Sequence, residues 1–143
     1  MKTSKPMQAT IEAIARKHNL DLSAESAHLR LENEPYMPLV IEKIGRHLVS
    51  VAHYFTQNGD AIADPDVVFF TGDGLWVPIE IQQVMGDQRV AELNGSGTAI
   101  KSLHTRAQAD VASFANLWAR NITAQQYLER GVNRAAVEAS HDE

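Results

Sequence analysis

Hydrophobic residues recur at helical spacing near the start of the chain and again in its last third. The first stripe consists of Met7, Ile11, Ile14 and Ala15. The second consists of Leu103, Ala107, Val111, Phe114 and Trp118. Spacings of three and four residues place each set on one face of a helix. The pattern therefore predicts an N-terminal helix within residues 1–20 and a long helix over residues 102–120.

Between these stripes the period of the pattern changes to two, as in strands. Alternation begins at residue 26, and the run 47–57 is partly apolar on both faces, as expected of a central strand. Residues 66–70, 75–82 and 88–93 continue the pattern, separated by glycine-containing turns. We therefore expect an antiparallel meander of about five strands over residues 26–93.

Proline makes two parts of this sheet ambiguous. Residues 34–38 contain two prolines and interrupt the alternation, so residues 37–44 can form either a strand or a helical turn. Pro78 lies within an otherwise regular strand pattern. Because proline cannot donate to a sheet, it indicates an edge strand or a bulge.

The region after the sheet is predicted to be helical. Residues 94–98 are rich in glycine and mark the boundary between the sheet and the helical part. The series Thr123-Ala124-Gln125-Gln126 has the spacing of a capping box, and Gly131 suits the end of the short helix that would follow. Residues 102–131 are expected to form the helical cover and residues 132–143 a frayed tail. The predicted fold is a single α+β domain, with the antiparallel sheet packed against the long helix.

Composition and charge limit the classes of function. The chain has 143 residues, no cysteine and a net charge of -5. The acidic balance does not support nucleic-acid binding, and the missing cysteines exclude disulfides, thiolate zinc sites and a cysteine nucleophile. No apolar run suits a signal peptide or a membrane span, so we expect a cytoplasmic protein with no membrane partner.

Three aspartates lie close together in the sequence. Asp60, Asp64 and Asp66 follow the turn signal Asn58-Gly59, with His53 upstream. Their carboxylates could hold a hard cation such as Mg²⁺ or Ca²⁺, but the spacing is not that of a known calcium loop. Aspartate also shapes turns through hydrogen bonds to its own backbone. Turn formation is the favoured interpretation, and no metal or other cofactor is expected.

A second motif suggests an alternative as a nuclease. Pro65-Asp66 followed by Glu80-Ile81-Gln82 resembles the catalytic motif of restriction-endonuclease-like nucleases, with glutamine in place of the usual lysine. Two carboxylates on adjacent strands could hold Mg²⁺ for hydrolysis, and alternation places Glu80 and Gln82 on one face. That fold, however, has a mixed sheet between helices. No catalytic residues are therefore assigned beyond this alternative of Asp66, Glu80 and Gln82.

The glycine-rich segment before the long helix has the spacing of a phosphate-binding loop. In residues 95–102, however, Ile100 occupies the position of the second required glycine. A β-branched side chain fits poorly where the backbone must wrap a phosphate. We therefore interpret the segment as a linker that ends in a helix-capping serine, Ser102.

The central part of the chain resembles an uncharacterised family of small proteins carried on bacterial plasmids, integrative elements and prophages. The resemblance covers residues 39–93 and rests on Ser50-Val51-Ala52-His53-Tyr54, Gln57-Asn58-Gly59-Asp60, Asp64-Pro65-Asp66, Trp76-x-Pro78 and Gln82-Gln83. It implies a domain of unknown function from a mobile element and brings no activity, cofactor or catalytic residue.

The favoured function is a non-enzymatic binding or accessory protein of a bacterial mobile element that acts through protein–protein contacts. The expected binding surface comprises His53, Tyr54, Asn58, Asp60, Asp64, Asp66 and Trp76. The alternatives are the metal-dependent nuclease and a small-ligand-binding domain with an apolar pocket between sheet and helix. Exposed sheet edges would also allow a homodimer.

Overall fold

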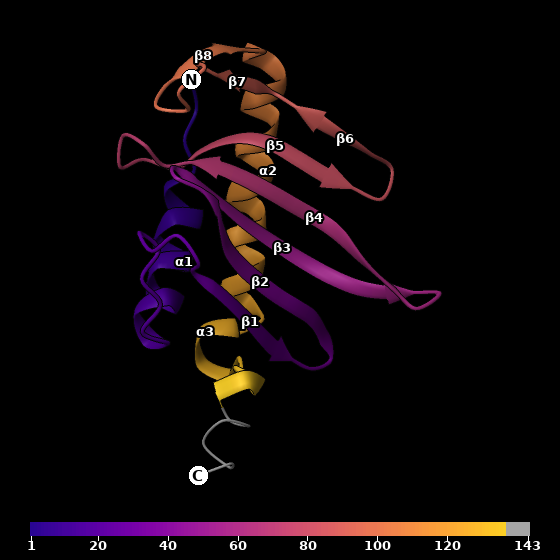
Figure 1. Cartoon of the computed structure of the whole chain (residues 1–143). Coiled ribbons are helices and arrows are strands. Elements are labelled where there is room, and N and C mark those ends of the chain that lie inside the picture. The colour runs from indigo at the N-terminus through magenta and orange to yellow at the C-terminus, as the bar shows by residue number, and fades with distance from the viewer. Residues whose placement is uncertain (137–143) are drawn as a thin grey trace.

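In the computed structural model, which describes residues 1–136, helices pack against one face of an antiparallel sheet (Figure 1). The elements follow the order α1 (Lys5–Lys17), β1 (His28–Asn33), β2 (Tyr36–Gly45), β3 (Leu48–Gln57), β4 (Asp60–Phe70), β5 (Val77–Gln83), β6 (Gly86–Arg89), β7 (Ala91–Leu93), β8 (Ile100–Leu103), α2 (Thr105–Ala124) and α3 (Tyr127–Arg130). The predicted α+β class and the N-terminal helix are confirmed.

The main sheet is a meander in which each strand pairs antiparallel with the next one along the chain. It has six strands in the order β1-β2-β3-β4-β5-β6, and β7 and β8 form a separate two-stranded sheet. The expected meander is therefore confirmed, although the sheet has six strands rather than about five. Residues 37–44 form part of β2, which resolves the choice between strand and helix.

The hairpin between β3 and β4 lies closer to the start of β4 than the predicted strand 66–70 implies. Asn58 and Gly59 both have positive φ, 53° and 86°, and Gln57 pairs directly with Asp60. Two positive φ values make the tight turn that matches the twist of paired strands. Strand β4 therefore begins at Asp60 rather than at Asp66, and the acidic segment lies in the sheet.

A bulge in β5 breaks the alternation predicted for residues 75–82. Val68 and Phe69 of β4 pair with Glu80 and Pro78, so Ile79 is the extra residue. An extra residue shifts every later side chain to the opposite face. Val77 and Ile79 consequently lie on the face of the sheet away from the helices, whereas Ile81 lies in the hydrophobic cluster that contacts the helices. Because β5 lies between β4 and β6, Pro78 marks a bulge and not an edge.

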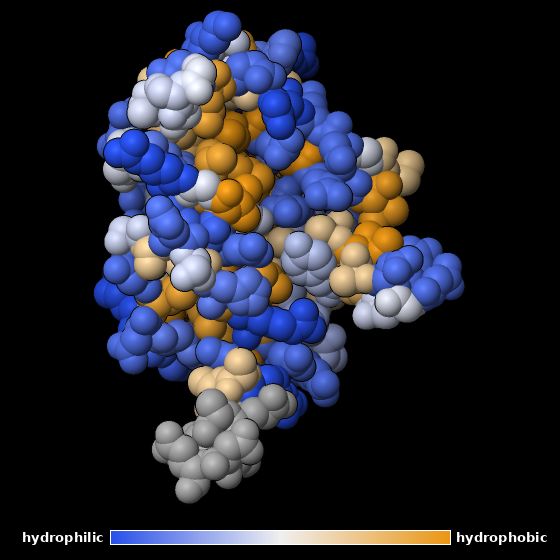
Figure 2. Space-filling view, in the orientation of Figure 1, coloured by the Kyte–Doolittle hydropathy of each residue, from blue (hydrophilic) through white to orange (hydrophobic). Residues whose placement is uncertain are grey.

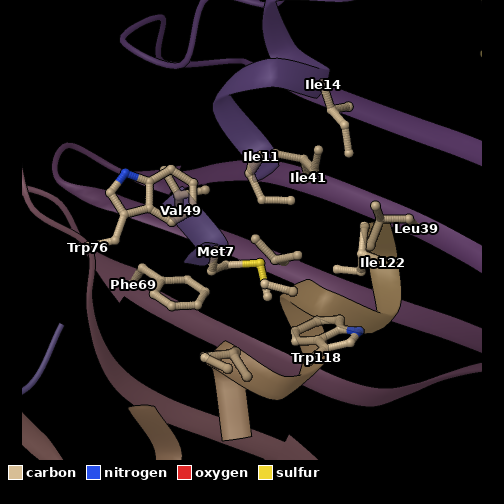
Figure 3. Packing of buried hydrophobic residues seen from close by; sticks show 14 of the residues in the cluster. Met7, Ile11, Ile14, Leu39, Ile41, Val49, Phe69, Trp76, Trp118 and Ile122 are labelled. Atoms are coloured by element: carbon tan, nitrogen blue, oxygen red, sulfur yellow. The ribbon is translucent and has the colours of Figure 1, made fainter. Parts of the chain in front are cut away.

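The helices cover one face of the sheet, which we call the inner face. Figure 3 shows Met7 and Ile11 of α1 and Trp118 of α2 packed together with sheet residues. The inner cluster also includes Leu29, Leu31, Leu39, Ile41, Val49, Val51, Val67, Phe69, Ile81, Ile122 and Tyr127. The strand members alternate with residues on the opposite face, which we call the outer face.

The outer face is covered only at one end within residues 1–136. A second cluster there contains Val68, Phe70, Val77, Ile79 and Ala91, with Leu48, Leu93, Ile100 and Leu103 packed against it. All of its members come from strands, and none comes from a helix. The ribbon β7–β8 thus covers the end of the outer face, while the helices leave the rest of it open.

The predicted long C-terminal helix is confirmed, but three details of this part of the chain differ from the prediction. The predicted strand 88–93 is divided between β6 and β7, because Val90 leaves the sheet after donating its N–H to the Ile79 carbonyl. The long helix is displaced to Thr105–Ala124, since the chain first returns as β8 to pair with β7. Ser102 therefore lies in a strand, and His104 is the residue at the N-cap.

The capping box predicted at residues 123–126 does not form. The Thr123 hydroxyl donates to the Ala119 carbonyl inside α2, and Gln126, with a φ of 63°, precedes α3 instead. Gly131 ends α3 as predicted. Val132 then pairs with Glu32 of β1, so the expected fraying does not begin there, and residues 137–143 of that predicted tail lie outside the described part of the chain.

Candidate functional site

Strand register fixes two rows of side chains across the outer face. The first row runs through His28, Glu42, Ser50, Val68, Glu80 and Arg89. The neighbouring row runs through Arg30, Val40, Ala52, Asp66, Gln82 and Asp87. Directly opposed residues in adjacent strands point to the same side of a sheet. The rows therefore bring Glu42, Asp66 and Glu80 onto one surface; we call these three residues the carboxylate trio.

Asp66 is the central member of this trio. Its Oδ1 accepts a hydrogen bond of 2.5 Å from the hydroxyl of Ser50, a buried residue of the neighbouring strand. Burial raises the pKa of Asp66, and the negative charges of Glu80 and Glu42 raise that pKa further, while the Ser50 hydrogen bond opposes the shift. Asp66 is thus a carboxyl group whose negative charge is poorly compensated.

The other polar groups around the trio are unequally paired. Arg89 lies 3.3 Å from Glu80 and 3.8 Å from Glu92. Tyr54 lies on the same face, where burial, and then the charges of Asp66 and Glu42, raise the pKa of its hydroxyl. Arg89 thus neutralises the charge near Glu80, whereas the repulsion between Asp66 and Glu42 is not compensated by a salt bridge within residues 1–136.

An apolar groove borders the trio, and we call it the outer groove. Its volume is about 390 Å³, and it is lined by Ile44, Leu48, Val68, Ile79, Ala91 and Leu93, with Glu80, Arg89 and Glu92 at its charged side. Figure 2, in the orientation of Figure 1, shows hydrophobic surface over β4 and β5 near β7. The groove exposes part of the second hydrophobic cluster at the place where the covering ribbon ends.

The structure distributes the residues of the expected binding surface over three places. Tyr54 and Asp66 lie on the outer face, beside Glu80 and Gln82 of the nuclease alternative. Asn58 and Asp60 are exposed at the hairpin tip, and Asp64 is half-buried further along β4.

The prediction of that surface is wrong for two residues, because their side chains lie in the protein interior. His53 is 7% exposed and Trp76 is 4% exposed. The His53 ring lies 5.3 Å from Trp118, and its Nδ1 lies 3.2 Å from the Pro38 carbonyl. Burial lowers the pKa of His53. Trp76 packs against Phe69 at 5.2 Å. Neither side chain can therefore contribute to an outer surface.

The acidic segment forms neither a turn nor a compact cluster. The turn interpretation is wrong, since Asp60 and Asp66 are six residues apart in one strand, about 20 Å along its axis. Among residues 1–136, no three side chains of His, Cys, Asp or Glu are grouped so that they could hold a metal ion. The structure thus separates the candidate metal ligands Asp60, Asp64 and Asp66.

The glycine-rich segment does not have the context of a phosphate-binding loop. Residues 94–98 form a local turn in which the Asn94 side chain accepts from the Thr98 N–H at 2.9 Å. The chain then passes through β8 before α2 begins at Thr105. No helix N-terminus is therefore presented by this loop.

Glu42 and Ser50 are neighbours of Asp66 that the sequence did not predict. Ser50 lies between Val49 and Val51 in β3, and Glu42 follows a continuous apolar run in β2, so neither position is marked as a neighbour of Asp66 by its local pattern. Their proximity to Asp66 depends on the pairing register, which local alternation does not specify. Only the assembled sheet brings these side chains together.

The raised pKa of Asp66 predicts a pH-dependent effect of replacing it. Because the pKa in the folded state lies above that in the unfolded state, the folded state binds the proton more tightly. This contribution to stability is present below the unfolded pKa and is lost as the pH rises through the folded pKa. We expect Asp66→Asn to be more stable than the wild type at pH 7, with a difference that shrinks under acidic conditions.

Urea unfolding at several pH values measures this difference. Asparagine can still accept the Ser50 hydrogen bond, so the substitution removes mainly the charge. Asp60→Asn, at an exposed position of the same strand, serves as the control and should change the stability by less than about 0.5 kcal/mol. A less stable Asp66→Asn protein at pH 7 would contradict the prediction.

Comparison with known proteins identifies a family. A model of the family described as domain of unknown function DUF6908 matches residues 9–128. No curated protein and no solved structure matches the chain. Within residues 1–136, no helix has both the length and the apolar character needed to cross a membrane. Because the match extends over most of its length, the chain belongs to the DUF6908 family.

Proposed function

We propose that this protein is a non-enzymatic binding protein that engages a protein partner through its outer sheet face. One observation carries the proposal: the part of the outer face left open by the helices holds an apolar groove beside charged side chains. An apolar centre with a polar rim is the usual composition of a protein interface. The sequence resemblance further supports an accessory role in a bacterial mobile element. As expected from the sequence, the proposed location is the cytoplasm and the proposed function needs no cofactor.

Site-specific photo-crosslinking tests this function. Ile44 lines the outer groove and is 48% exposed, whereas Leu117 of α2 is 54% exposed and is not among the groove residues. A photoreactive residue at position 44 should give an adduct of one reproducible mass in cells that carry the gene naturally. The matched residue at position 117 should not give that adduct.

A groove variant makes the crosslinking experiment specific. Leu48→Asp places a charge in the groove lining and should abolish the adduct from position 44. Circular dichroism confirms that the variant is folded; if it is not, the smaller change Leu48→Ala replaces it. Equal adducts from positions 44 and 117, or no adduct from position 44, would overturn the proposed function.

The nuclease alternative keeps one specific observation in its favour. Asp66 and Gln82 are direct partners in adjacent strands, and Glu80 lies on the same face. A titration with Mg²⁺ or Mn²⁺, followed by NMR amide shifts, distinguishes the two functions. Saturable shifts of the Asp66 and Glu80 amides would favour a metal-dependent enzyme. If the protein is a non-enzymatic binding protein, the amide shifts should not change when metal is added. The small-ligand alternative has less support, because the inner cluster fills the space between sheet and helices.

A further inference from the structure

The outer groove and the carboxylate trio form one continuous surface. Val68 and Glu80 line the groove and are direct partners in β4 and β5. Ser50 is the partner of Val68 on the other side, and its hydroxyl bonds to Asp66 in the next row. Val68 and Asp66 are two residues apart in β4, so a ligand seated against Val68 would lie about 7 Å from Asp66 along the strand.

The groove can accept an apolar side chain. Its floor is aliphatic, with Leu48, Val68 and Ile79 contributed by three different strands. The volume of about 390 Å³ exceeds that of one large aliphatic or aromatic side chain, and burying such an apolar group favours binding. One apolar anchor with the adjoining backbone of a peptide would fit this space.

The trio provides charge complementarity for a cation. Arg89 pairs with Glu80 and Glu92. In the described part of the chain, neither Glu42 nor Asp66 has a salt bridge. A positive side chain between these two carboxylates would relieve their mutual repulsion, and charge-assisted hydrogen bonds are the stronger ones.

We propose that the partner segment is a basic, extended peptide that places an apolar side chain in the outer groove and an Arg or Lys side chain against Glu42 and Asp66. This inference rests on the proposed function and adds the chemistry of the partner. A nucleic acid is disfavoured as the occupant, because the trio and the net charge of -5 repel phosphates. An extended peptide also suits the flat surface of a sheet, along which alternate side chains point toward the face.

Three labelled peptides of equal length test the chemistry by fluorescence anisotropy. The first alternates leucine and arginine, the second leucine and glutamate, and the third serine and arginine. The leucine–arginine peptide should bind saturably, and its affinity should fall as salt is added, because salt screens the charges. The other two should bind at least about tenfold more weakly, since each lacks one of the two contacts.

Protein variants locate the binding on the surface. Glu42→Gln removes one carboxylate charge, and Leu48→Ala removes part of the groove floor. Each substitution should lower the affinity for the leucine–arginine peptide roughly tenfold, whereas Leu117→Ala on α2 should leave this affinity unchanged. If the affinity depends less on salt in Glu42→Gln than in Leu48→Ala, the arginine side chain of the peptide contacts the carboxylate trio.

The outcomes separate this inference from the proposed function. If all three peptides bind equally, or if none binds while position 44 still crosslinks to a partner, the basic peptide is wrong and the binding function stands. If neither crosslinking nor peptide binding occurs, both are overturned. Sedimentation of the protein alone provides a further check: a dimer abolished by Leu48→Ala would identify a second copy as the occupant and overturn the peptide.

Discussion

Replacing Trp118 with alanine should lower the free energy of unfolding by about 3–5 kcal/mol, the usual cost of removing a buried tryptophan. Trp118 lies in the inner cluster where α2 meets the sheet, and its ring packs against His53 at 5.3 Å and Phe114 at 6.1 Å. The substitution would leave a cavity between α2 and the sheet and would remove the contacts that Trp118 makes there. Urea unfolding followed by circular dichroism measures the loss.

Trp118→Phe is the matched variant. The indole Nε1 is buried without a hydrogen-bond partner in the described chain. An unpaired buried donor costs about 1–3 kcal/mol. Phenylalanine removes that donor and keeps most of the aromatic contact, so the variant should differ from the wild type by only about 1 kcal/mol. If Trp118→Phe is as unstable as Trp118→Ala, the indole N–H must have a stabilising contact, such as the face of a neighbouring ring.

Replacing Gln108 with leucine should cost about 2–3 kcal/mol, because three hydrogen bonds of a buried amide are lost together. Gln108 is 1% exposed. Its Oε1 accepts from the Lys2 N–H at 2.9 Å, and its Nε2 donates to the carbonyls of Lys2 at 2.7 Å and Pro78 at 3.2 Å. The side chain thus ties α2 to both the N-terminal segment and the bulge of β5.

A shortened chain separates the contributions of these bonds. A protein that begins at Thr3 lacks both contacts to Lys2 but keeps the bond to Pro78, and its new terminus does not fall on Ser4, which is fully buried. It should lose less stability than Gln108→Leu, which also leaves the Pro78 carbonyl unpaired next to the bulge. Thermal unfolding of the two proteins provides the comparison. Equal losses would show that the bond to Pro78 contributes nothing measurable.

Local patterns in the sequence are sufficient to predict most of the elements. Helical spacing of apolar residues identified α1 and most of α2, and Asn58-Gly59 identified a two-residue turn of the meander. These signals act over a few residues, since spacing determines the face of a helix and glycine tolerates positive φ. The sequence alone therefore predicted the α+β class and a meander sheet between an N-terminal helix and a long C-terminal helix.

The faces of the strands required the tertiary structure. One extra residue at Ile79 changes the face on which Ile81 lies, and a count of alternating positions cannot detect it. His53 and Trp76 looked suitable for a surface because their residue types serve both interfaces and cores. Their burial follows from where the helices pack, which depends on contacts between distant parts of the chain.

The candidate site shows the same division. The sequence by itself determined that Asp66, Glu80 and Gln82 occur in strands, with the latter two on one face. Only the tertiary structure decided that Asp66 meets Ser50 and that Glu42 joins the trio, because pairing register spans three strands. Alternation is a property of one strand, whereas proximity between strands depends on every turn and bulge that connects them.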